Sequence, residues 1–297
     1  MLSGNRFVPL VSLLVAFSAD FAYADVPGAR ALGRAGTGLA DSGDVAGTAE
    51  NLAAVSLLEQ YSVAAGAGLG PDEAWVVRAE AADSRTSVVS LAAGYYRLSD
   101  NVPPTGDLLP AWVVVGEEIS NISVHQGVFL GVAYPFLNRR LSIGTVGRVD
   151  WLDSELEGSP VSGNFGFTAA GKPVDSLTIA AGAFDLLDLG YRDMVRHASL
   201  GVRWAPGAYL AIEAGSSARI DGTAFSDALD VGGGLDVYAV KWLVVRGGYA
   251  REAQENVVTG GVGIIAEGKA AVDYGIRWDV GSDPIRLRHG LDLRINF

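Results

Sequence analysis

The C-terminal segment of the chain, Lys269 to Phe297, shows the clearest alternation of hydrophobic and polar positions. Its last run places these apolar side chains on one face: Leu291, Leu293, Ile295 and Phe297. The opposite face of that run carries Asp292, Arg294 and Asn296. A strict period of two predicts a β-strand with one apolar and one polar face. The run from Val272 to Asp279 repeats the pattern, which predicts a hairpin.

Alternating runs recur throughout residues 61–297. They begin near residues 61, 75, 89, 128, 141, 165, 177, 198, 210, 229, 243 and 257. Short links such as Pro206-Gly207 alternate with longer ones such as Asp185 to His197, which is typical of a barrel with short turns at one rim. At roughly 17 residues per strand and connection, about 14 strands are expected. Trp112 to Val124 is open to three interpretations: a strand, an internal segment or part of a loop.

The polar faces of these runs carry full charges in mid-strand. In a packed core each unpaired charge would cost several kcal/mol, whereas in a lumen it is solvated or paired. The residues expected to line such a lumen are Arg148, Arg203, Glu213, Asp230, Asp236, Arg246, Asp273, Arg277, Asp292 and Arg294. The charges therefore favour a barrel whose apolar face meets lipid.

Aromatic residues gather at the ends of the runs, as in the girdles of a membrane barrel. They are Tyr95, Tyr134, Trp151, Trp204, Tyr249, Trp278 and Phe297. The predicted fold class is all-β, a transmembrane antiparallel barrel over residues 61–297. The alternative is a secreted soluble β-protein with a solvated polar face.

The first 24 residues have the pattern of a signal peptide. Arg6 supplies a positive charge, Phe7 to Phe17 is apolar, and Ala22-Tyr23-Ala24 is a small-x-small cleavage site. The apolar run is too short for a membrane-spanning helix, which needs about 20 residues. Cleavage is expected to leave Asp25 as the mature N-terminus, and the alternative is a short membrane anchor.

Residues 25–60 are rich in Gly and Ala and lack the period of two. Thr48 to Asn51 is expected to cap a short helix from Leu52 to Leu58. The glycines at 33–38 have neither dinucleotide-binding spacing nor a following Gly-Lys-Ser/Thr, which argues against nucleotide binding. The segment is predicted to be a compact plug inside a larger structure.

Composition narrows the partners and the chemistry. The net charge of -12 argues against nucleic acid and against anionic lipid headgroups as electrostatic partners. The chain has no Cys, which excludes disulfides and thiolate metal sites. His125, His197 and His289 lack the spacing of metal ligands. Acid–base pairs of His197 with Ser199, or of His289 with Asp292, are conceivable, but no nucleophile accompanies them. Neither a cofactor nor an enzyme activity is expected.

One N-terminal pattern resembles a known family. The run from Gly33 to Asp41, then Asp44 and then Asn51 to Val55, resembles the N-terminal hatch of the FadL-like outer-membrane proteins. This superfamily includes fatty-acid transporters, aromatic-hydrocarbon channels and the PorV-type proteins of a secretion system. Its members usually have Asn-Pro-Ala before the first strand, and Leu52 stands here in place of the proline.

The resemblance implies a 14-stranded barrel of the bacterial outer membrane with an N-terminal plug at residues 25–60. It implies a channel for small, hydrophobic molecules, gated by a plug whose shape depends on Gly33, Gly36, Asn51 and Ala53. Phe297 is similar to the signal that the outer-membrane assembly machinery reads on a last strand. The expected partners are outer-membrane lipid, that machinery and a hydrophobic small-molecule ligand. The alternative is a PorV-type, non-enzymatic scaffold or secretion-system partner. The chain is short for the family, so its extracellular loops are expected to be small.

Overall fold

A computed structural model describes residues 28–45, 48–70, 74–102, 121–154, 161–187, 196–220, 229–252, 255–267, 269–280 and 286–297. The predicted signal peptide, residues 1–24, lies outside the described residues. Among the residues that the structure describes, no helix is long and apolar enough to cross a membrane.

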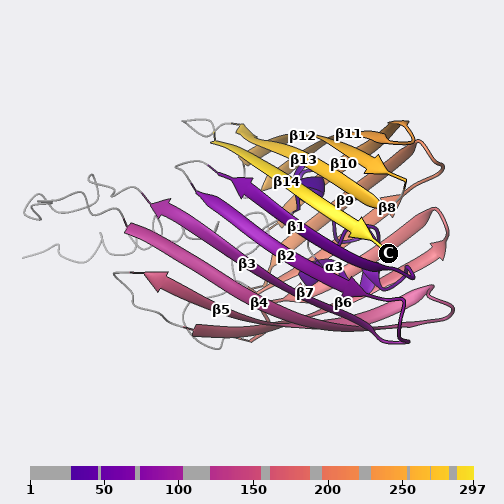
Figure 1. The fold of residues 1–297 in the computed structure, drawn as a ribbon, viewed down its shortest axis with the longest axis horizontal. Coiled ribbons are helices and arrows are strands. Elements are labelled where there is room, and N and C mark those ends of the chain that lie inside the picture. The colour runs from indigo at the N-terminus through magenta and orange to yellow at the C-terminus, as the bar shows by residue number, and fades with distance from the viewer. Residues whose placement is uncertain are drawn as a thin grey trace, which may run out of the picture.

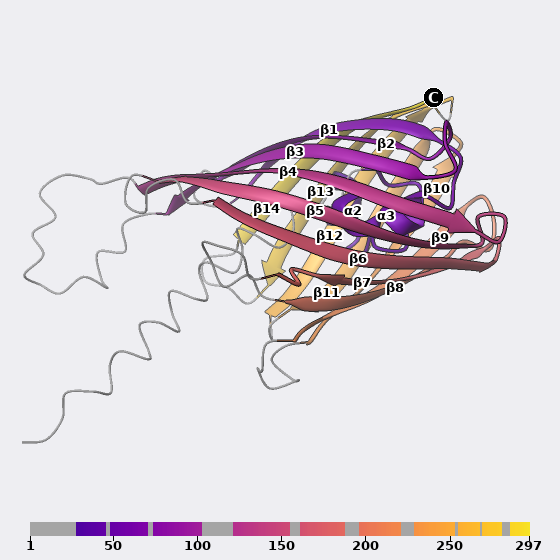
Figure 2. The same ribbon diagram turned by 90° about the horizontal axis from the view of Figure 1, so that it is seen from below.

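Fourteen antiparallel strands form a closed barrel in which each strand pairs with its neighbours in sequence, and β1 pairs with β14 (Figures 1 and 2). The strands are β1 (Tyr61–Leu69), β2 (Trp75–Asp83), β3 (Ser90–Val102), β4 (Asn121–Phe136), β5 (Leu141–Ser154), β6 (Val161–Val174), β7 (Leu177–Phe184), β8 (His197–Trp204), β9 (Leu210–Arg219), β10 (Leu229–Val240), β11 (Leu243–Glu252), β12 (Glu255–Ala266), β13 (Ala270–Val280) and β14 (Arg286–Asn296). The predicted fold class and strand count are confirmed.

Strand β3 is longer than the sequence predicted. The prolines at 103 and 104 predict a loop from Asp100 to Pro110, but Asp100 and Asn101 continue the ladder by pairing with Ser123 and Ile122 of β4. Strand β4 begins at Asn121, so only the end of the ambiguous stretch Trp112 to Val124 is strand, and its earlier part lies outside the described residues.

The seam between β1 and β14 closes the barrel. The register runs from Ser62↔Asn296 to Leu69↔His289. Phe297 donates its backbone N–H to the carbonyl of Tyr61 at 2.8 Å, and the two rings lie 5.6 Å apart. The predicted pairing of the last strand with the strand near Tyr61 is therefore confirmed.

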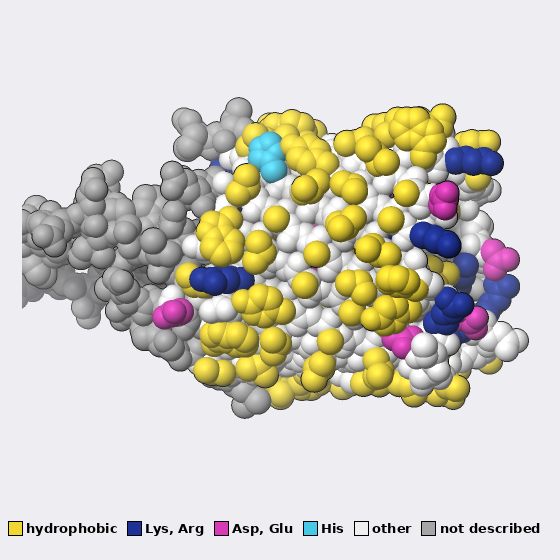
Figure 3. All heavy atoms as spheres, viewed as in Figure 1, with side chains coloured by type: hydrophobic (Ala, Val, Ile, Leu, Met, Phe, Trp, Pro, Cys, Tyr) yellow, Lys and Arg dark blue, Asp and Glu magenta, His cyan; other side chains and the backbone are white. Residues whose placement is uncertain are grey.

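Side chains alternate between the outer face and the lumen along each strand. Leu130 and Ile143 are 71% and 56% exposed on the outer face, whereas Asp236 inside is fully buried. Figure 3 shows apolar side chains spread over the middle of the barrel wall, with charged side chains gathered near its ends. This is the surface of a barrel that faces lipid, because a soluble protein would bury its apolar face instead.

The two ends of the barrel differ. At the terminal rim, where β1 begins and β14 ends, the turns are residues 84–89, 137–140, 175–176, 205–209, 241–242 and 267–269. At the opposite end, the loop rim, the connections include residues 103–120 and 185–196. Of the aromatic residues expected in girdles, Tyr134, Trp204 and Phe297 lie toward the terminal rim. The others, Tyr95, Trp151, Tyr249 and Trp278, lie toward the loop rim.

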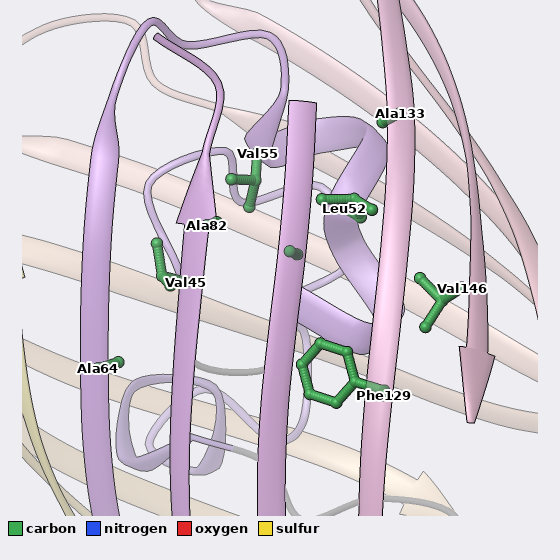
Figure 4. Packing of buried hydrophobic residues seen from close by; sticks show 9 residues of the cluster. Val45, Leu52, Val55, Ala64, Ala82, Phe129, Ala133 and Val146 are labelled. Atoms are coloured by element: carbon green, nitrogen blue, oxygen red, sulfur yellow. The ribbon is translucent and has the colours of Figure 1, made fainter. Parts of the chain in front are cut away.

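Among the described residues, two short helices lie inside the barrel, α2 (Ala29–Leu32) and α3 (Thr48–Val55) (Figure 2). Helix α3 packs Leu52 and Val55 against the wall around Phe129 and Val146 (Figure 4). The prediction of a helix from Leu52 to Leu58 was wrong in its limits. The expected cap, Thr48 to Asn51, is the first turn itself, because Glu80 of β2 accepts the Thr48 N–H at 2.9 Å.

Closure predicts a cross-link across the seam. Val63 and Ile295 are paired in register and both face outward. Because the chain has no Cys, a V63C/I295C double variant should form one disulfide on oxidation and migrate as a circularised chain after denaturation in detergent. The offset pair V63C/L291C should remain open. Equal cross-linking of both pairs, or of neither, would contradict this register.

Candidate functional site: the plug and the charged lumen wall

All ten residues expected to line the lumen lie on the inward face of their strands. Arg148, Arg203 and Asp230 are half-buried. The other seven, Glu213, Asp236, Arg246, Asp273, Arg277, Asp292 and Arg294, are at most 8% exposed. Buried charges at such positions need partners, because an uncompensated charge in a low-dielectric site is costly. The plug, residues 28–56, supplies several of those partners.

Arg34, immediately after α2, lies at the centre of an ionic network. Its side chain is fully buried, and Nη1 lies 2.6 Å from Glu213, 3.0 Å from Asp41 and 3.5 Å from Asp236. Burial alone would lower the pKa of Arg34, but the facing carboxylates of Glu213, Asp236 and Asp41 outweigh it and hold the pKa above its ordinary value. Arg34 is therefore charged, and it joins the plug to β9 and β10.

The network extends from Arg34 along the wall. Arg30 of α2 lies 2.8 Å from Asp41, and Arg203 of β8 lies 3.4 Å from the other oxygen of that carboxylate. Arg246 of β11 contacts Asp236 at 3.3 Å and Asp273 of β13 at 2.7 Å. Ion pairs thus run from the plug through β8, β9, β10, β11 and β13. Several ion pairs, rather than one, therefore join the plug to this side of the barrel.

Polar contacts also hold the plug to β2 and β14. Asp292 of β14 binds Arg78 of β2 at 2.6 Å and accepts a hydrogen bond from the Ala29 N–H at the start of α2. Arg294 donates to the carbonyl of Gly43. Together with the bond from the Thr48 N–H to Glu80 of β2, these contacts join the plug to strands on both sides of the β1–β14 seam.

Inward-facing glycines let the plug backbone lie flush against the wall. A Cβ on Gly275 would lie 2.2 Å from the carbonyl oxygen of Ala29. A Cβ on Gly234 or Gly248 would lie 2.7 Å from an atom of Arg34. These distances are too short for real Cβ contacts, so larger residues here would displace the plug. The alternation in the sequence shows that these positions face inward, but not what fills the space.

The four plug residues singled out in the sequence lie at turns or close contacts. Gly36 has a φ of +75°, and a Cβ on Gly33 would lie 3.3 Å from Gly261. Asn51 donates from Nδ2 to the carbonyls of Asp44 at 2.9 Å and Asp41 at 3.2 Å, which ties the loop before α3 to that helix. Ala53 is 1% exposed and packs in an apolar cluster.

A second charged cluster lies toward the loop rim. Arg148 contacts Asp150 at 2.8 Å and Asp185 at 2.9 Å, and Asp185 lies 3.6 Å from His197. The Tyr96 hydroxyl bonds to Asp150. The alternation singled out Arg148. By the same alternation Asp150, two residues further along β5, shares the face of Arg148. Asp185, which follows β7, was not identified, because a partner from a distant part of the chain leaves no local signal.

The conceivable acid–base pairs take other partners in the structure. His289 lies on the outward face, where its Nδ1 is 2.6 Å from the Tyr274 hydroxyl, while Asp292 faces inward. His289 and Asp292 therefore lie on opposite faces of β14 and do not pair. Ser199 donates to Ser217 at 3.2 Å.

Comparison with solved structures identifies the fold. No protein-family model matches the chain, and no curated sequence matches it significantly. The toluene transporter TbuX of Ralstonia pickettii aligns with a TM-score of 0.67 and 12% identity, over 91% of this chain and 98% of that one. The toluene transporter TodX of Pseudomonas putida gives 0.64 and 11%, over 92% and 98%. A FadL homologue of Pseudomonas aeruginosa gives 0.65 and 11%, over 92% and 98%. The chain therefore has the FadL-like barrel fold.

The network predicts a large effect of Arg34 on the plug. In an Arg34→Met variant the carboxylates of Glu213, Asp41 and Asp236 lose a shared cation, which should weaken plug docking by about 3–5 kcal/mol. Hydrogen exchange of residues 28–45, followed by mass spectrometry, should accelerate accordingly. Arg140→Met is the matched control, because Arg140 pairs at the surface with an 86% exposed Asp175. Equal exchange in both variants would contradict the network's role.

Asp44 predicts a pH dependence of plug docking. Burial raises the pKa of its carboxyl from 3.8 to about 6, and Arg34 approaches it only to 3.7 Å. The docked plug therefore favours the protonated form, so docking should be strongest near pH 4 and weaken by roughly a hundredfold as pH rises through 6. After correction for intrinsic rates, exchange of residues 28–45 should show this trend, and Asp44→Asn should reduce it. A wild-type profile that matches Asp44→Asn would contradict the prediction.

Proposed function

We propose that the protein is an outer-membrane channel for small hydrophobic molecules, gated by its own plug. The observation that carries the proposal is that one segment of the chain, residues 28–56, is bonded to strands on opposite sides of the lumen. A solute cannot pass at this level while the segment is docked. A non-enzymatic role accords with the solved transporters of the same fold, whose names describe transport of toluene.

The plug is held differently on its two sides. Helix α3 contacts β2 to β7 through apolar side chains, which include Val55 and Leu52. Residues 29–44 are held against β8 to β14 mainly by ion pairs and by the flush fit against glycines. Charged groups released from ion pairs regain hydration once water reaches them, whereas an apolar surface is exposed to water at a cost. Residues 28–45 are therefore the part that moves, and α3 stays with the wall.

The apolar contacts of the plug are an argument that the permeant is hydrophobic. Val45, Phe129 and Val146 lie together where the plug meets β4 and β5. When residues 28–45 move, Val45 leaves this cluster and an apolar surface is exposed to the lumen. The permeant diffuses along that surface and leaves into the periplasm or laterally through the wall.

Deletion of residues 28–45 should open the channel. In planar bilayers, wild-type protein should conduct little, and the deletion variant should show stable open steps. Arg34→Met should give intermittent openings, because the ion pairs at the centre of the plug are weakened. Arg140→Met should behave as wild type.

Uptake measurements in cells test whether the permeant is hydrophobic. Gram-negative cells that carry the protein should take up labelled toluene faster than cells without it, and the deletion variant should be faster still. A variant that conducts ions but does not raise toluene uptake would contradict the hydrophobic substrate class. If the protein gives no conductance and no uptake, and a stoichiometric partner appears in pull-downs, the PorV-type scaffold is favoured instead.

A further inference from the structure

Lysine is confined to one end of the barrel. The whole chain contains three lysines, Lys172, Lys241 and Lys269. All three lie at the terminal rim, in or beside the turns that follow β6, β10 and β12. Lys241 and Lys269 are exposed and Lys172 is half-buried. Among the described residues, none of the three forms an ion pair.

Arginines reinforce this rim. Arg85, Arg139 and Arg140 lie in the turns after β2 and β4. The acidic side chains at this rim are Glu59, which precedes β1, and Asp83, Asp175 and Glu267, which lie in or next to its turns. The rim thus has six cationic side chains against four acidic side chains in a chain whose net charge is -12. The total charge argued against anionic lipid headgroups as partners, but the total conceals this uneven distribution.

A cavity of about 570 Å³ opens in this rim between the turns after β2 and β4. Its polar lining comes from Glu59, Arg85, Thr86, Ser87, Asn138 and Arg139. Val88 and Pro135 complete the lining, and Val88 is 66% exposed. The cavity therefore has one polar side and one apolar side, at the height of the aromatic Tyr134 near the membrane interface.

The two arginines that line the cavity, Arg139 and Arg85, differ in their hydrogen-bond and ion-pair partners. Arg139 donates to the carbonyls of Ser56 and Ser84, each at 2.7 Å, and contacts Glu59 at 3.2 Å. Asp83 is occupied within its own turn, where it accepts the N–H groups of Arg85 and Thr86 at 3.0 Å. The exposed guanidinium of Arg85 consequently has no carboxylate partner among the described residues.

The turn that forms one wall of the cavity is strained. Leu137, Asn138 and Arg139 have φ values of 52°, 54° and 58°. Three successive non-glycine residues in the left-handed region are uncommon, and such strain tends to occur at binding sites. Here the conformation points Asn138 and Arg139 at the cavity, and the bonds of Arg139 hold it in place.

We propose that the cavity binds the headgroup of an anionic phospholipid, with Arg85 on its phosphodiester and the lysines of the rim holding further headgroups around the barrel. A phosphodiester complements a guanidinium without a carboxylate partner. Serine, threonine and asparagine side chains suit the glycerol hydroxyls of such a headgroup. Val88 and Leu137, 66% and 70% exposed, offer apolar surface to the acyl chains of such a lipid. The proposal depends on the barrel lying in a membrane and not on its transporting a solute.

Native mass spectrometry of the detergent-purified full chain tests the proposal. The chain should retain palmitoyl-oleoyl phosphatidylglycerol at least about fivefold more than palmitoyl-oleoyl phosphatidylcholine, since each interfacial cation contributes about this factor. Arg85→Gln should lower phosphatidylglycerol retention by about fivefold, and the variant with Gln at all three lysines should lower the number of lipids bound. Heat-dependent migration in detergent gels verifies that each variant is folded.

The matched control is Arg97→Gln. Arg97 is exposed on β3 toward the loop rim, where it stacks on Trp75 at 5.6 Å. Retention of phosphatidylglycerol should be unchanged in this variant. Equal retention of the two lipids, or an equal loss in the Arg85 and Arg97 variants, would overturn the proposal. Displacement of the lipid by an equimolar amount of inorganic phosphate would also overturn it, because the site would then bind free phosphate.

Discussion

The ion pairs of Arg34 are the interaction on which the arrangement inside this barrel depends. A guanidinium without solvent contact is stable only among carboxylates, and the chain supplies these from the plug and from two strands of the wall. The same pairs allow Glu213 and Asp236 to remain buried. The plug and the lumen wall are therefore mutually dependent, since each provides the charges that the other needs.

The dependence extends to the backbone of the wall. Small residues such as Gly234, Gly248 and Gly275 bring the chain around Arg34 close enough for its side chain to reach β9 and β10. Apolar packing fixes the other half of the plug at α3. In the proposed gate, water releases the polar half of the plug, and the apolar half at α3 stays on the wall.

Much of the fold was predictable because a barrel strand carries its own signal. Alternation at Asp273 and Asp292 identified inward positions, and the run ending at Phe297 identified the closing strand. The N-terminal pattern from Gly33 to Val55 indicated the FadL-like fold. The limits of α3 were missed because Glu80, a residue of β2, decides where that helix begins. The partners of the lumen charges were missed for the same reason, since Arg30, Arg34 and Asp41 have no periodicity. The cationic rim was missed because net charge is a sum over the whole chain.

The central claim is that residues 28–45 close the lumen by docking on its wall, and a reversible lock tests it most directly. A Cβ on Gly201 would lie 3.1 Å from the Cβ of Leu39, and the chain has no other Cys to interfere. In the L39C/G201C double variant, a disulfide should pin the plug to β8. Toluene uptake by cells that carry this variant should fall to the background level on oxidation and return on reduction. Equal uptake in the oxidised and reduced states, with the disulfide verified by mass spectrometry, would contradict the account.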